Sequence, residues 1–288
     1  MAGYMTLDDP LATGGTFANG ISGSTVVGGY YDGTGLHGFV YDGSSWKTLN
    51  DPLATGGTFA AGISGSTVVG EYFDGTGTHG FLYDGTSWKT LNDPLGSTTT
   101  RATGISGNDI VGSYNSVNDH GFLYDGTSYK PLDNPLGTFG TDPWGISGNN
   151  IVGSYLDATG TLHGFLYDGS SYKTLDDPLA TGDTLATGIS GSNIVGIYRD
   201  GTVDHGFLYD GTSWKTLNDP LGTLGTDPEG ISGSIVVGVY YDGTGAHGFL
   251  YQPDAPAVPA PSSLALLGTA FVTGLVYFGW RRRRLAAA

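Results

Sequence analysis

The sequence predicts an all-β protein that folds as a six-bladed β-propeller, and three observations lead to this prediction. A pattern of about 42 residues recurs six times, which is the length of one propeller blade. Each copy contains four short strand-like segments separated by turns rich in Gly and Asp. The chain also begins with an unpaired fourth segment and ends its repeats on a third segment, so that the two ends can complete one blade.

The repeat is defined by short motifs that occur once in every copy. The pentapeptide His-Gly-Phe-(Leu/Val)-Tyr contains all the histidines of the chain: His37, His79, His120, His163, His205 and His247. The triplet Gly-Ile-Ser is centred on Ile21, Ile63, Ile105, Ile146, Ile189 and Ile231. The motif Val-Gly-X-Tyr contains Gly28, Gly70, Gly112, Gly153, Gly196 and Gly238. Motifs repeated in one order and at one spacing indicate one structural unit used six times.

The second copy illustrates the strands in order. Its first strand ends at Gly62-Ile63-Ser64, and a Val- and Tyr-rich second strand follows at Thr67–Phe73. Asp74–Gly77 is a turn, because Gly and Asp tolerate positive φ. The third strand is His79–Tyr83 and the fourth is Trp88–Leu91. No segment of the first 251 residues has a helical period, so the whole body is predicted to be β.

The two ends of the repeat region predict how the ring closes. Tyr4–Pro10 has the fourth-strand pattern but no preceding copy. His247–Tyr251 is a third strand that leaves the repeat through Gln252-Pro253. We expect the N-terminal strand to pair with this last strand, because closure removes exposed sheet edges.

Composition excludes several classes of function. The chain has 52 Gly, 13 Pro and no Cys, which excludes disulfides, thiolate nucleophiles and Cys-ligated metals. Residues 1–257 hold 7 basic and all 27 acidic residues, a net charge of −20. Nucleic acid is therefore not an expected partner, since phosphate binding needs clustered Lys and Arg. The aromatic content of 12% favours a packed core over a flexible Gly-rich chain.

The repeat resembles the HAF repeat of predicted extracellular bacterial proteins. In the second copy Gly62-Ile63, Val68-Val69-Gly70 and His79–Tyr83 carry the resemblance, and the other copies match likewise over nearly all of residues 1–251. Gly80 stands where that family often has Ala. The family has no agreed activity, so the resemblance implies export and architecture and no catalysis.

The C-terminal part predicts a membrane anchor. Residues 252–257 form a Pro/Ala linker, and residues 263–280 contain no charge. These 18 residues would span about 27 Å as a helix, close to the roughly 30 Å of a bilayer core. The basic stop signal that follows is Arg281, Arg282, Arg283 and Arg284. By the positive-inside rule, residues 281–288 form a cytoplasmic tail.

The order of short motif, single apolar helix and Arg cluster resembles the PEP-CTERM sorting signal. The motif residues are Val258, Pro259, Ala260, Pro261 and Ser262, with Ala260 where that family has Glu. The resemblance implies export to the cell envelope or beyond and processing by an exosortase-type membrane enzyme. Met1–Pro10 has no secretory signal pattern, and a mis-assigned start codon would reconcile this with export.

The repeated polar residues are interpreted as structural. Each His occupies the same place in a different blade, so the histidines should not converge on a metal. The Asp-Gly-Thr-Gly segments lack the alternating acids of an EF-hand and read as hairpin turns. No metal or cofactor is expected, although weak Ca²⁺ binding by these turns stays open.

Residues that break the repeat are the remaining candidates for function. Glu71, Arg101, Arg199 and Glu229 are interpreted as tolerated surface variation. Variation concentrates between the fourth and first strands and between the second and third strands, which a four-stranded blade places on one face of the ring. Trp144, expected in a loop of that face, is the one candidate ligand contact, because equivalent positions hold small or polar residues. The alternative is that Trp144 only covers the neighbouring blade.

These observations favour a noncatalytic surface or matrix protein over an enzyme. A propeller with repeated weak sites gains avidity from multivalency, and its Trp and Tyr side chains can stack on sugars, so polysaccharide is the candidate ligand. The alternative is a glycan-active enzyme on the same scaffold. It would place two carboxylates from different blades about 5–10 Å apart in the axial channel.

Overall fold

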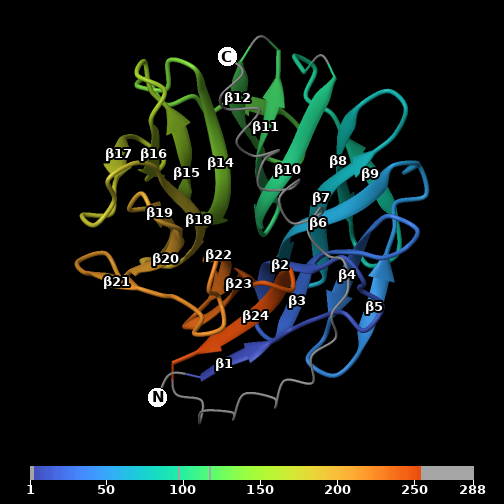
Figure 1. The fold of residues 1–288 in the computed structure, drawn as a ribbon. Coiled ribbons are helices and arrows are strands. Elements are labelled where there is room, and N and C mark those ends of the chain that lie inside the picture. The colour runs from blue at the N-terminus through green and yellow to red at the C-terminus, as the bar shows by residue number, and fades with distance from the viewer. Residues whose placement is uncertain (1–2, 97, 117, 254–288) are drawn as a thin grey trace.

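A computed structural model describes residues 3–96, 98–116 and 118–253, and all regular structure in these residues is β. The strands surround a central axis, with one strand of each set innermost (Figure 1). The innermost strands are β2 (Thr16–Ser22), β6 (Gly57–Ser64), β10 (Thr99–Ser106), β14 (Gly140–Ser147), β18 (Thr184–Ser190) and β22 (Gly225–Ser232). The second strands are β3 (Thr25–Tyr31), β7 (Thr67–Phe73), β11 (Asp109–Asn115), β15 (Asn150–Leu156), β19 (Asn193–Arg199) and β23 (Ile235–Tyr241).

The outer half of each set follows the same order. The third strands are β4 (Leu36–Tyr41), β8 (Thr78–Tyr83), β12 (Asp119–Tyr124), β16 (Leu162–Tyr167), β20 (Asp204–Tyr209) and β24 (Ala246–Gln252). The fourth strands are β5 (Trp46–Leu49), β9 (Trp88–Leu91), β13 (Tyr129–Pro131), β17 (Tyr172–Leu175), β21 (Trp214–Thr216) and β1 (Gly3–Thr6). Consecutive strands pair antiparallel, as in β2-β3-β4-β5. The strands predicted at Thr67–Phe73 and Trp88–Leu91 have those bounds.

The N-terminal strand completes the last set, as the sequence predicted. Strand β1 pairs antiparallel with β24, from Gly3 opposite Gln252 to Thr6 opposite Phe249. The strand is shorter than the expected Tyr4–Pro10, but the backbone N–H of Leu7 still donates to Gly248 O at 2.7 Å. The first and last strands therefore lie side by side (Figure 1).

The inner strands meet at glycines, which explains the constant Gly-Ile-Ser triplet. A Cβ atom placed on any of them would lie 3.0 to 3.2 Å from the Cα of the next one around the axis, including Gly230 against Gly20. We call this set the axial glycines: Gly20, Gly62, Gly104, Gly145, Gly188 and Gly230. Each adjoining turn also donates a backbone N–H to a serine of the preceding set, from Gly65 to Ser22 through Gly23 to Ser232, at 3.0 to 3.1 Å. Small residues are required here because backbones approach closely.

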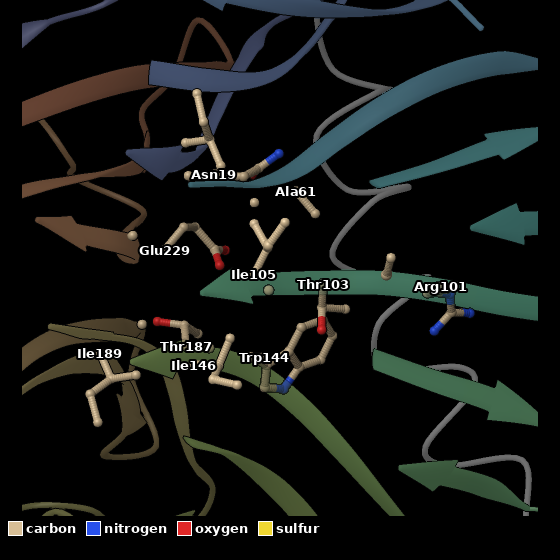
Figure 2. Close-up of a pocket in the computed structure, with 18 of the residues that line it drawn as sticks. Asn19, Ala61, Arg101, Thr103, Ile105, Trp144, Ile146, Thr187, Ile189 and Glu229 are labelled. Carbon is tan, nitrogen blue, oxygen red and sulfur yellow. The ribbon is translucent and has the colours of Figure 1, made fainter. Parts of the chain in front are cut away.

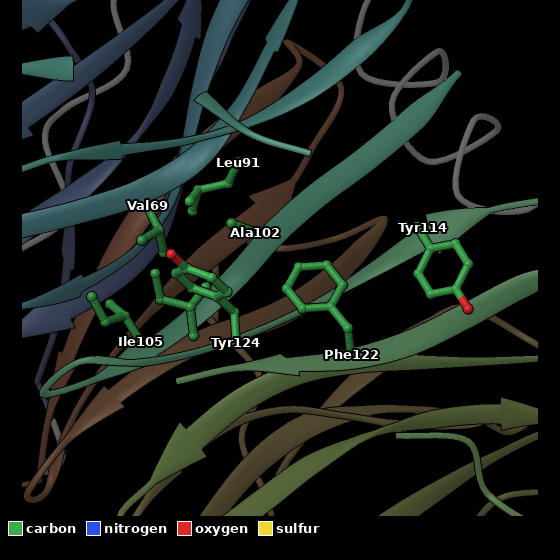
Figure 3. Packing of buried hydrophobic residues seen from close by; sticks show 8 residues of the cluster. Val69, Leu91, Ala102, Ile105, Tyr114, Phe122 and Tyr124 are labelled. Carbon is green, nitrogen blue, oxygen red and sulfur yellow. The ribbon is translucent and has the colours of Figure 1, made fainter. Parts of the chain in front are cut away.

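The hydrophobic core lies between neighbouring sets of strands. In one cluster, Val69 of β7 and Leu91 of β9 pack against Ala102 of β10 and Phe122 of β12 (Figure 3). Phe122 is fully buried, and so are its counterparts: Phe39, Phe81, Phe165, Phe207 and Phe249. The ring of Phe122 lies 2.7 Å from where a Cβ on Gly112 would stand. The Val-Gly-X-Tyr and His-Gly-Phe motifs thus encode one packing unit, in which a glycine makes room for a phenylalanine.

The structure describes none of the predicted anchor. No helix in residues 3–96, 98–116 and 118–253 is long and apolar enough to cross a bilayer. The sorting motif at 258–262, the predicted helix at 263–280 and the basic tail at 281–288 lie outside the described residues, as does most of the linker.

Candidate functional site

A cavity of about 110 Å³ lies where the inner strands converge (Figure 2). Its lining takes the same position from each inner strand, the residue just before the axial glycine. We call these the pocket residues: Asn19, Ala61, Thr103, Trp144, Thr187 and Glu229. They differ in charge, size and polarity, although the residues on both sides of them repeat almost unchanged. The repeat therefore varies at its axis as well as in its loops.

Alternate pocket residues hold the ring together. Asn19 Nδ2 donates to Ala60 O at 2.9 Å, Thr103 Oγ1 to Pro143 O at 2.8 Å, and Thr187 Oγ1 to Pro228 O at 2.6 Å. In each case the acceptor belongs to the next inner strand. A buried side chain that bonds a neighbouring backbone has a structural role. The pocket residues at the intervening positions are Ala61, Trp144 and Glu229, and the last two add an aromatic face and a carboxylate to the cavity.

Trp144 lies in a strand, and the predicted loop position is wrong. It belongs to β14, at a bulge between Pro143 and Gly145 where the register with β15 shifts. Pro is tolerated in a strand at a bulge, and bulges redirect side chains, so Pro and Gly here mark a bulge instead of a turn. The half-buried indole lines the cavity (Figure 2), and its Nε1 donates to Ser154 Oγ at 3.2 Å.

Glu71 and Arg101 are also buried, so their interpretation as surface variation is wrong. Both line the cavity, and Arg101 Nε lies 3.1 Å from Glu71 Oε2, with the side chains 9% and 7% exposed. Glu229 is half-buried in the same cavity. A signal existed in the sequence. The positions equivalent to Arg101 hold an apolar residue in three copies and an aspartate in two: Phe17, Phe59, Leu185, Asp142 and Asp227. Charges at a strand position that is apolar in the other copies indicate a polar interior.

Arg199 lies away from the cavity and stabilises a loop. Its Nε lies 2.7 Å from Asp204 Oδ1, and its Nη1 bonds the carboxylate of Asp183. Burial would lower the pKa of Arg199, but these two carboxylates outweigh it and the pKa is raised. This residue joins the ends of β19 and β20 to the loop before β18.

Each histidine is held by its own set of strands. His247 Nδ1 lies 2.8 Å from Asp8 Oδ2, and its ring stacks on Tyr240 with centroids 5.0 Å apart. His163 is placed likewise between Asp176, at 2.8 Å, and Tyr155. Among the described residues, no three His, Asp or Glu side chains are arranged to hold a metal ion. The histidines support turns and strand ends.

The Asp-Gly turns use their carboxylates internally. Asp74 Oδ1 accepts bonds from the backbone N–H and hydroxyl of Thr76, both at 2.7 Å, and from Gly77 N at 3.1 Å. These hydrogen bonds lower the pKa of Asp74 to about 2, and the bond from the Thr76 hydroxyl has the largest effect. The expectation of no cofactor, with weak Ca²⁺ binding by these turns as the alternative, stays a prediction.

The contact between His247 and Asp8 predicts that ring closure depends on pH. The bond from Asp8 raises the pKa of His247 above its ordinary 6.5 despite burial. A raised folded pKa adds stability that is complete below about pH 6.5 and is lost as pH rises through the folded value. We expect the urea midpoint to fall between pH 5.5 and 8.5, and to fall less in Asp8→Asn. Other copies carry Asn50 and Asn92 opposite their His, so Asn is compatible with this position. Equal slopes in both proteins would contradict this assignment.

Comparison with known proteins supports the sorting signal and the fold. Residues 257–284 match the model of the PEP-CTERM protein-sorting motif. TolB from Acinetobacter baumannii has a TM-score of 0.55 at 14% identity, over 79% of this chain and 63% of TolB, so this chain spans less than two thirds of that protein. The β-propeller domain of the Trilobed protease from Pyrococcus furiosus has a TM-score of 0.53 at 10% identity, over 84% and 85% of the two chains. No curated protein matches.

A third solved structure with this fold is the fucose-specific lectin from Aleuria aurantia. Its TM-score is 0.50 at 13% identity, over 83% of this chain and 95% of the lectin. At these identities the likeness shows the fold alone, which is all-β and propeller-like. The resemblance of the repeat to the HAF family stays a prediction.

Proposed function

We propose that this protein is exported, is sorted to the cell envelope by its C-terminal motif, and binds a small ligand at the axial cavity without converting it. The match to a sorting motif at 257–284 supports the proposed location at the cell envelope. Anchoring by residues 263–280, or processing by an exosortase-type enzyme at Val258–Ser262, would then hold the body on the surface or release it outside.

The body of this surface protein is a six-bladed β-propeller closed by its N-terminal strand. Three features support the closed ring: the pairing of β1 with β24, the contact of Gly230 with Gly20, and the bond from Gly23 N to Ser232 Oγ at 3.1 Å. Each of them joins the first part of the chain to the last part. A closed ring gives the cavity fixed walls, which favours binding because little is ordered on association.

The main support for binding is that the amino acid at one equivalent position around the axis differs between the copies. At positions where only packing determines the residue, all six copies carry the same residue, as the axial glycines do. Packing does not require a Trp or a Glu at this position, since another copy has Ala61 there. An aromatic face in such a site suits a sugar ring, worth about 1–3 kcal/mol by analogy with bases stacked on aromatic side chains. A sugar unit of a cell-surface polysaccharide is therefore the ligand that we propose.

A glycan-active enzyme remains the second candidate, because the cavity holds carboxylates from several sets of strands. Glu71, Asp119, Asp142 and Glu229 all line it. Glu71 pairs with Arg101, however, and Asp119 Oδ1 accepts from Asn115 Nδ2 at 3.0 Å, so these carboxylates serve contacts within the protein. This favours binding over catalysis. Release of reducing ends from polysaccharide, lost in Glu229→Gln, would support the enzyme instead.

Cell fractionation tests whether the protein is anchored in the membrane. The full chain is expected to sediment with membranes and to need detergent for release, because residues 263–280 carry no charge and precede four arginines. A chain ending at Gln252 should stay in the soluble fraction. Replacing Arg281–Arg284 with serine is the matched control, and it should alter orientation more than sedimentation. A full chain that is soluble without cleavage would contradict the anchor.

A further inference from the structure

The walls of the axial cavity carry an excess of negative charge. Four carboxylates line it, from Glu71, Asp119, Asp142 and Glu229, against one guanidinium, from Arg101. The formal charge of the lining is therefore −3, and neither Lys nor His belongs to it. The guanidinium is itself engaged by Glu71 at 3.1 Å. Such a lining repels anions and lowers the free energy of a bound cation.

The aromatic wall favours the same kind of ligand. The indole of Trp144 and the carboxylate of Glu229 come from β14 and β22, with β18 between them, and both border the central space (Figure 2). A cation close to the face of Trp is attracted by the ring quadrupole, and Trp is the best of the aromatic side chains for this. The half-buried carboxylate of Glu229 favours a charged hydrogen-bond donor.

The charge of the whole body acts in the same direction. Residues 1–257 carry a net charge of −20, so cations concentrate near the protein before they reach the cavity. The cavity of about 110 Å³ therefore lies within a body whose charge attracts cationic ligands.

We propose that the axial cavity recognises a positively charged amino group, with the ammonium beside Glu229 and the attached ring or hydrocarbon against Trp144. This inference rests on the proposed binding function and names the chemical class of its ligand. Two sources share this chemistry: a free amino sugar unit of a polysaccharide, and a small organic amine. A neutral or acetylated sugar would gain the stacking on Trp144 without the attraction to the carboxylates.

Calorimetric titration of the full chain in detergent tests this class with four probes: glucosamine, N-acetylglucosamine, glucose and cyclohexylamine. We expect glucosamine to bind at least tenfold more tightly than N-acetylglucosamine and glucose, and to weaken as salt is raised. Cyclohexylamine distinguishes the sources. Affinity equal to that of glucosamine indicates a general amine site, and weaker affinity indicates an amino sugar site.

Variants of single carboxylates locate the effect. Glu229→Gln should lose at least tenfold in glucosamine affinity and abolish the preference over N-acetylglucosamine. The control Asp210→Asn removes one charge from an exposed turn and should change neither. The comparison of ligands needs no variant, so it holds even where Glu229→Gln fails to fold. Equal affinity for the three sugars would overturn the amine inference and leave the binding function standing, whereas no binding of any probe would overturn both.

Discussion

Removing residues 1–9 is expected to unfold most of the protein under conditions in which the full chain is stable. This truncation deletes β1, exposes the edge of β24, and removes Leu7, which is 4% exposed. It also removes the ring of Tyr4, which lies 4.8 Å from that of Tyr251 and 5.7 Å from that of Phe249. Full burial of Leu7 alone contributes about 1.5–3 kcal/mol and the half-buried Tyr4 adds to it, which is a large part of the roughly 5–15 kcal/mol that typically stabilises a domain.

Urea unfolding followed by circular dichroism measures this loss. The truncated chain should show a much lower midpoint and a tendency to associate through the open edge of β24. Met5→Ala is the matched control, because this β1 side chain is 43% exposed and its loss should change the midpoint little. A truncated protein as stable as the parent would mean that the N-terminal strand does not close the ring.

Gly196→Ala is expected to destabilise the protein strongly, because the added methyl group has no space. The new Cβ would stand 2.0 Å from Leu185 O and 2.6 Å from the ring of Phe207. Neither neighbour can yield, since the carbonyl belongs to β18 and Phe207 is fully buried. Overpacking typically costs about 1–3 kcal/mol, and the close contact with a backbone carbonyl places this substitution at the upper end of that range.

Gly75→Ala is the control for this substitution. A Cβ at Gly75 meets nothing within 4 Å, and its φ lies outside the left-handed region. Thermal unfolding of the two variants should therefore separate them clearly, with Gly75→Ala near the parent. Equal melting temperatures for the two variants would contradict the idea that the close packing of Phe on Gly holds the sets of strands in place.

Local signals in the sequence were sufficient for the strands and for the closure. Alternation in segments such as Thr67–Phe73 and turn residues such as Asp74-Gly75 act within one hairpin, and the structure has strands and turns there. The segment that begins at Tyr4 has the fourth-strand pattern without a preceding copy, and the last copy has no fourth strand of its own. The sequence therefore predicted that this segment pairs with β24.

The interior of the ring could not be predicted in the same way. Which side chains converge at the axis depends on the bulge in each inner strand and on contacts between residues some 40 positions apart, such as Asn19 with Ala60. Pro143 and Gly145 are typical of turns, so Trp144 was expected in a loop. Glu71 and Arg101 compensate each other's burial only in three dimensions, because they come from β7 and β10.

Retention of the full chain on its own cell-surface polysaccharide, compared between the parent and Trp144→Ala, tests most directly whether the axial cavity is the binding site. Melting temperatures of both proteins are recorded in parallel, and Trp144→Phe serves as the matched control that keeps an aromatic face while losing the bond to Ser154. We expect Trp144→Ala to lose retention by roughly 5- to 150-fold, which corresponds to about 1–3 kcal/mol of stacking, with little change in melting temperature. Unchanged retention with a large drop in melting temperature would show that Trp144 only supports the fold, and would contradict binding at the axis.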